Sequence, residues 1–150
     1  MKELRGTASG MVAATRGECF AVLEAVDRYP EWYPDVVRSV EVLERGPQDR
    51  PAKVRAKLHV EHGPITKDFD LVMDVLVDEP DNVKLARDTG GRSGQAFDVT
   101  WRLSGEERTR LALDLYANLD APRFLPLGGI GDSIAQGFVA AATAAIESRR

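Results

Sequence analysis

The side chains of this chain that most readily suggest chemistry are two histidines and one cysteine. His59 and His62 lie three positions apart in an alternating segment, so they project to opposite faces of a strand and cannot chelate one metal as a pair. We expect His59 on the wet face and His62 at a strand end, as a rim residue rather than a general base. Cys19 lies on the apolar side of a helical pattern, which favours packing, and a single cysteine excludes an intrachain disulfide.

Arg87 and Gln95 are polar residues at positions that share the parity of apolar neighbours. Arg87 continues the alternation of Val83 and Leu85. An arginine buried without a partner is costly, so it would need a carboxylate or a ligand oxygen. Alternatively, the parity slips near the turn that follows and the side chain reaches solvent. Gln95 precedes Phe97 with the same parity, and both interpretations apply to it as well.

The sequence contains no familiar catalytic signature. No G-x-S-x-G nucleophile motif occurs, and the glycine-rich run LGGIG (127–131) follows a proline-broken segment and lacks the lysine of a P-loop. We expect these glycines to let the chain bend before a helix, or to act as a hinge for ligand entry. The sequence therefore predicts no catalytic residue, no metal site and no cofactor.

Aromatic residues are concentrated in one proline-broken stretch, DRYPEWYPDV (27–36). Trp32 and Tyr33 are adjacent between Pro30 and Pro34, and the prolines stop this turn from extending the helix before it. On packing grounds alone the two aromatics would fill the end of a core, because such side chains bury a large area wherever they lie.

Composition and charge argue against several classes of partner. The 150 residues include 20 basic and 24 acidic side chains, for a net charge of −4. This balance disfavours a nucleic-acid surface and a polybasic membrane anchor. The first residues lack the apolar run of a signal peptide, and no stretch approaches the ~20 apolar residues that span a bilayer. We expect a single domain (1–150) in the cytoplasm, with no integral membrane segment.

The elements that must position these residues follow from the apolar period. Apolar and polar residues alternate from about residue 51 to 119, which predicts an antiparallel meander with one apolar face. Weaker strand patterns occupy 3–14, diluted by Gly6 and Gly10, and 36–45. The runs are separated by turn signals: GPQDRP (46–51), HGP (62–64), DEPDN (78–82), TGGRSG (89–94) and SGEE (104–107).

Two regions have a helical period instead. Thr15 and Glu18 have the spacing of a capping box before a first helix, and DRYPEWYP predicts a short second one. After Pro122 the apolar residues recur every three or four positions, which predicts a long amphipathic helix that begins near Ile130. This helix must cover the apolar face of the sheet, since an exposed face of that size would aggregate. The predicted class is therefore α+β.

This order of elements is the helix-grip arrangement, and the chain resembles the START/Bet v 1-like (SRPBCC) superfamily, in its polyketide cyclase/dehydrase and lipid-transport branch. It is also similar to the coenzyme Q-binding and ribosome-association subgroup. The resemblance implies a seven-stranded curved antiparallel sheet around a long C-terminal helix, with two short helices after strand 1. It is carried by three stretches: FAVLEAVDRYPEWYPDVVRSVEVLERG (20–46), VTWRLSGEERTRLALDLYANL (99–119) and GFVAAATAAIESR (137–149).

The resemblance also implies a cavity between sheet and helix, closed at one end by the short helices. Trp32 and Tyr33 would then line or gate its mouth. The end of the long helix offers mainly alanines, so one helix would leave apolar space unfilled. The residues that we expect to bind a ligand are Trp32, Tyr33, Phe69, Met73, Arg87, Phe97, Trp101, Ile134 and Phe138.

We therefore expect a carrier or sequestering protein for a hydrophobic small molecule such as a lipid, an isoprenoid quinone or a polyketide-like compound. A polyketide cyclase or dehydratase is the enzymatic alternative, and the almost wholly apolar inward positions disfavour it. The third hypothesis is a protein-interaction module of the ribosome-association type. The acidic balance disfavours direct RNA contact in that case but leaves a protein partner open.

Overall fold

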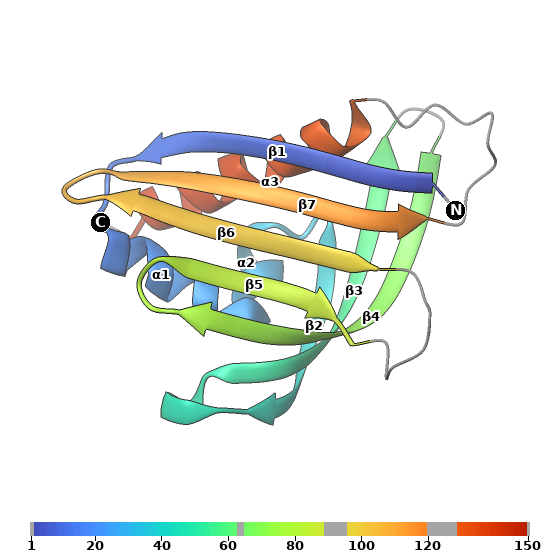
Figure 1. Cartoon of the computed structure of the whole chain (residues 1–150), viewed down its shortest axis with the longest axis horizontal. Coiled ribbons are helices and arrows are strands. Elements are labelled where there is room, and N and C mark those ends of the chain that lie inside the picture. Colours follow the sequence, from blue (N-terminus) through green and yellow to red (C-terminus); the bar gives the residue numbers. More distant parts are fainter. Residues whose placement is uncertain (1, 63–64, 89–95, 120–128, 150) are drawn as a thin grey trace.

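The computed structural model describes residues 2–62, 65–88, 96–119 and 129–149, and in them one antiparallel sheet curves around a long helix (Figure 1). The strand order is β1-β7-β6-β5-β4-β3-β2. The strands are β1 (Lys2–Val12), β2 (Val37–Arg45), β3 (Pro51–His62), β4 (Ile65–Asp78), β5 (Asn82–Arg87), β6 (Phe97–Gly105) and β7 (Thr109–Leu119). The helices are α1 (Arg16–Glu24), η1 (Val26–Arg28), α2 (Tyr29–Trp32), η2 (Pro47–Asp49) and α3 (Ile130–Glu147). The predicted α+β helix-grip fold is confirmed.

The strand register follows from the alternation of apolar and charged residues. Val83 of β5 pairs with Trp101 of β6, which pairs with Leu113 of β7, and all three side chains are buried on the concave face. The opposite face carries ion pairs between neighbouring strands, such as Arg55 with Asp70 at 2.7 Å. A shift by one residue would exchange these two faces, so the pattern specifies the register.

The first helix begins where its capping box predicts. The Thr15 hydroxyl accepts a hydrogen bond from the Glu18 N–H (3.3 Å), and the Glu18 carboxylate accepts one from the Thr15 N–H (3.4 Å). The helix ends before Ala25, and Pro30 lies in the first turn of α2. The short helices therefore remain separate, as the two prolines predict.

The long helix packs against one side of the sheet, where it contacts β1 and β7 (Figure 1). It begins after Gly129, whose φ of 82° lies in the left-handed region that favours glycine. Asp132 accepts a hydrogen bond from the Thr7 N–H (2.9 Å), and Glu147 accepts one from the Ala13 N–H (3.0 Å). The two ends of the helix are thus bonded to the edge strand β1 and to the residue that follows it.

The short helices pack against the same concave face, beside α3. The edge strand β2 is contacted by η1 and α2, and α1 contacts β5, β6 and α3. The cavity expected for this fold would therefore lie between the concave face of the sheet and α3, with the short helices at one end. Among the described helices, none combines the length and the hydropathy of a membrane-spanning segment.

Candidate ligand-binding site

Two small apolar cavities lie between the concave face of the sheet and α3, each with a volume of about 30 Å³. The inner cavity is lined by Val26, Tyr29, Val37, Val40, Ala56, Leu58, Met73, Leu85, Phe97, Val99 and Phe138. The outer cavity is lined by Leu4, Val36, Leu58, Val60, Lys67, Phe69, Phe97, Leu115, Ile130, Ile134 and Phe138. Most residues around the inner cavity are buried, whereas many around the outer one are half-buried, so the outer cavity lies nearer the surface.

Three side chains belong to both walls and form a partition: Leu58, Phe97 and Phe138. Phe97 is half-buried, and its ring centroid lies 5.7 Å from that of Phe69. Each cavity is far below the roughly 300 Å³ at which ligand pockets begin. The apolar space expected between the sheet and α3 is thus reduced to two small cavities. Displacement of the partition would join the two cavities into one apolar channel.

The structure brings most of the predicted site residues to these cavities. Phe69 and Ile134 line the outer cavity, Met73 lines the inner one, and Phe97 and Phe138 line both. The remaining predicted residues, Arg87, Trp101, Trp32 and Tyr33, line neither cavity. The side chain of His62, and Gln95 as a whole, lie outside the described residues.

Arg87 has the inward parity that the alternation predicts. It is the last residue of β5, it is half-buried, and its register partner on β4 is the inward-facing Met73. The backbone N–H of the next residue, Asp88, still donates to the Val72 carbonyl (2.8 Å), so the pairing with β4 persists beyond Arg87. The slip of register that would send this arginine outward does not occur before the strand ends.

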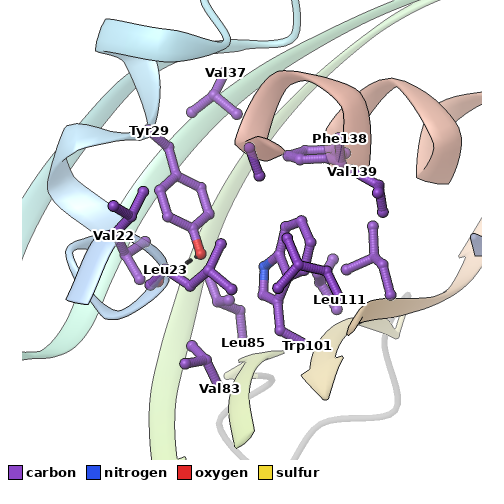
Figure 2. Close-up of a cluster of buried hydrophobic side chains, with 14 of the residues drawn as sticks. Val22, Leu23, Tyr29, Val37, Val83, Leu85, Trp101, Leu111, Phe138 and Val139 are labelled. Carbon is purple, nitrogen blue, oxygen red and sulfur yellow. Dashed lines mark hydrogen bonds between the residues drawn. The ribbon is translucent and has the colours of Figure 1, made fainter. Parts of the chain in front are cut away.

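Trp101 is fully buried and lines neither cavity. Its indole N–H points toward the hydroxyl of Tyr29, but the arrangement falls short of a well-formed hydrogen bond (Figure 2). The Tyr29 hydroxyl donates instead to the Leu23 carbonyl at 2.6 Å. Burial raises the pKa of Tyr29 far above its ordinary value, although the nearby indole N–H opposes this shift. Tyr29 is therefore a neutral hydrogen-bonding group in the inner wall.

Trp32 and Tyr33 form an aromatic bridge from α2 to α3. The ring of Trp32 lies 4.7 Å from Tyr29 and 6.4 Å from Tyr33, and Tyr33 meets Phe138 of α3 edge-on at 4.7 Å. The Tyr33 carbonyl accepts hydrogen bonds from the N–H groups at the start of β2. Burial raises the pKa of Tyr33, and the Asp35 carboxylate raises it further. The aromatic bridge closes the gap between the short helices and α3 beside the partition residue Phe138.

One lining residue, Lys67, was not anticipated from the sequence. It pairs in register with Val60 on β3 and lies two residues before Phe69, so it faces the outer cavity. The parity of Phe69 and Leu71 extended by one step would have identified it. Among the described lining residues, Tyr29 and Lys67 are the ionisable ones.

Within the described ranges, no three histidine, cysteine or acidic side chains are placed to hold a metal ion. His59 lies on the outer face, as predicted, with its Nδ1 atom 2.6 Å from a carboxylate oxygen of Asp68. Cys19 is buried in the packing of α1.

Comparison with known proteins identifies both a family and a fold. Residues 12–145 match the family described as polyketide cyclase / dehydrase and lipid transport. No curated protein matches the chain. Among solved structures, a conserved protein from Geobacillus kaustophilus has a TM-score of 0.75 at 18% identity, with 97% of this chain and 96% of that chain covered. A START superfamily protein from Mycobacterium smegmatis has a TM-score of 0.71 at 17% identity, with 97% and 96% covered.

A third neighbour carries an enzymatic name. The Zhui aromatase/cyclase from Streptomyces sp. R1128 has a TM-score of 0.63 at 18% identity, with 99% of this chain and 96% of that chain covered. Identities this low establish the shared fold and leave function to be argued from the site.

Proposed function

Because the chain belongs to the polyketide cyclase/dehydrase and lipid transport family and has the START/Bet v 1-like fold, we propose that it binds a hydrophobic small molecule between the sheet and α3 and carries or sequesters it. The observation that supports this proposal is the partition of Leu58, Phe97 and Phe138 between two apolar cavities. A ligand that displaced these side chains would gain a continuous apolar channel. Its affinity would come from buried apolar area, at roughly 25 cal/mol per Å².

A carrier is favoured over a cyclase by the chemistry of the described walls. Acid–base catalysis needs a group whose pKa lies near the working pH. Burial moves the pKa of Tyr29 away from that range, and its hydroxyl is already engaged with a backbone carbonyl. The described walls offer one further ionisable group, Lys67. Turnover of a polyketide substrate would instead show that the protein is an enzyme. Capture of a specific protein partner would indicate an interaction module.

A negative charge placed in the outer cavity should strongly weaken binding of a hydrophobic fluorescent probe. Ile134 lines this cavity from α3, whereas Gln136 is exposed on the same helix. We expect Ile134→Glu to weaken probe binding at least about tenfold, because the carboxylate replaces apolar contact area with a hydrated group whose desolvation is strongly disfavoured. Gln136→Glu adds the same charge two residues away and should leave the affinity unchanged.

Probe titration with circular dichroism of both variants tests the location of the site. Equal affinities in the two folded variants would move the site away from α3. Native mass spectrometry of protein purified from its source, followed by extraction, tests the function itself. A bound apolar compound is expected, and its absence together with failure of the wild type to bind any probe would contradict the proposal.

The aromatic bridge should control the rate of exchange more than the affinity. Trp32→Ala removes the contacts with Tyr29 and Tyr33 that hold the bridge against Phe138. Since an aromatic pair is worth roughly 0.5–1.5 kcal/mol, we expect the on-rate and the off-rate of the probe to rise together by about twofold to tenfold. Stopped-flow mixing measures both rates.

Val22→Ala is the matched control, because Val22 is buried in α1 and lines neither cavity. It should lower stability and leave the exchange rates unchanged. If Trp32→Ala changes stability alone, in the manner of Val22→Ala, then Trp32 is a packing residue and does not gate the site.

A further inference from the structure

The outer cavity combines an apolar wall with a single cationic side chain. Ten of its eleven described lining residues are apolar, and the eleventh is Lys67. The side chain is half-buried between the neighbouring Phe69 and the paired Val60. A lysine in such a place lays its methylene stem on the apolar wall and keeps its ammonium at the opening.

The position of Lys67 is fixed by the sheet and not by a flexible loop. Eight consecutive register pairs join β3 to β4 from Arg55–Val72 to His62–Ile65, and Lys67 lies among them. Its neighbours Thr66 and Asp68 are exposed on the opposite face of β4, where Asp68 contacts His59. Rotation of Lys67 to the outer face would require a shift of the strand by one residue.

Its ammonium has no partner within the described part of the chain. No ion pair or hydrogen bond joins Lys67 to another described residue. Nearby carboxylates on these strands are engaged elsewhere: Asp68 contacts His59, and Asp70 forms a two-point ion pair with Arg55. The cation at the opening is therefore available to a ligand.

We infer that the outer cavity takes an amphiphile with an anionic headgroup, a carboxylate or a phosphate monoester, which binds the ammonium of Lys67. The apolar chain of this ligand lies along Phe69 and Phe97 and enters the partition toward the inner cavity. The inference rests on the proposed function and adds the chemical class of the ligand to it. A charged headgroup bound at the rim stays partly hydrated, so its desolvation costs less than it would in the inner cavity.

The experiment compares three ligands with the same twelve-carbon chain: dodecanoate, dodecyl phosphate and dodecanol. Calorimetric titration below their aggregation concentrations gives each dissociation constant. We expect wild-type protein to bind one or both anions about tenfold more tightly than the alcohol, the factor typical of one charge-assisted hydrogen bond. The stronger of the two anions distinguishes a carboxylate from a phosphate headgroup.

Variants at two lysines test whether the preference for anionic ligands depends on Lys67. Lys67→Gln should lower anion affinity to that of dodecanol and leave dodecanol binding unchanged, while Lys67→Arg should keep the preference. Lys57→Gln is the matched control, since Lys57 is exposed on the outer face of β3 and pairs in register with Asp70. It removes the same charge and should have no effect.

Equal affinities of wild-type protein for the anions and the alcohol would overturn the inference while leaving the proposed function intact. The same follows if Lys57→Gln and Lys67→Gln reduce anion binding equally, because a general charge effect would then explain the preference. Failure of all three ligands to bind would contradict both the inference and the proposed function. Circular dichroism of each variant ensures that the comparisons concern folded protein.

Discussion

Replacement of Gly6 by alanine should destabilise the protein by at least about 3 kcal/mol, at the upper end of the usual cost of overpacking. A Cβ at this position would overlap the carbonyl group of Gly131 in the first turn of α3. The reverse holds for Gly131, whose Cβ would overlap the carbonyl group of Arg5. Both obstacles are backbone, which cannot rotate away as a side chain can. The helix must therefore move off the edge strand.

Movement of α3 would also weaken the hydrogen bonds that join it to β1. The Asp132 carboxylate that accepts from the Thr7 N–H lies in the same turn as Gly131. The apolar stripe of α3 covers the concave face over Leu113 and Trp101, so separation would expose the core. A loss of this size is a large part of the 5–15 kcal/mol that typically stabilises a domain.

Gly17→Ala makes the same chemical change in a site that can accept it. Gly17 is exposed within α1, and a Cβ there would meet no atom within 4 Å. We expect stability to rise by up to about 1 kcal/mol, because alanine is the better helix former. Urea titration of the two variants measures the difference. A loss below about 1 kcal/mol for Gly6→Ala would show that β1 and α3 can separate at little cost.

This contact also shows where sequence-based inference stops. Alternation and helical period predicted all seven strands, the capped first helix and the start of α3. These elements could be predicted because the apolar pattern of each one lies within its own stretch of sequence. In the sequence, Gly6 only dilutes a strand pattern. Its role depends on Gly131, which lies 125 residues later in the chain. The periodicity of neighbouring residues cannot indicate that these two backbone segments contact each other.

The candidate site likewise has features that the local sequence predicts and features that it does not. Phe69, Met73, Ile134 and Phe138 could be predicted to face the cavities from parity and helix stripe alone. The division of the apolar space into two small cavities could not be predicted, since it depends on how aromatic rings from several elements pack together. Asp132 lies in the first turn of α3, where an acidic residue is favoured, but the hydrogen bond that its carboxylate accepts from the Thr7 N–H depends on a strand far away in the sequence.

The second large effect is expected for Trp101→Ala. Trp101 is fully buried beneath α3, where Phe138 and Val139 face it, with Leu85 and Leu111 nearby (Figure 2). Removal of a large buried side chain from a packed core costs roughly 3–5 kcal/mol, because the surrounding structure collapses only in part. Denaturant titration should therefore show a loss of this size, with the m-value unchanged if unfolding stays two-state.

The same substitution at the other tryptophan separates core from site. Trp32 is half-buried on the aromatic bridge, so Trp32→Ala should cost clearly less stability than Trp101→Ala and should speed ligand exchange more. Trp101 remains a predicted ligand contact only if the ligand displaces the partition and reaches it. In that case Trp101→Ala weakens probe binding in the fraction that stays folded, beyond what its loss of stability explains. Equal stability losses for the two variants would show that Trp32 is as firmly packed as Trp101, which would remove the structural basis for a gate at the aromatic bridge.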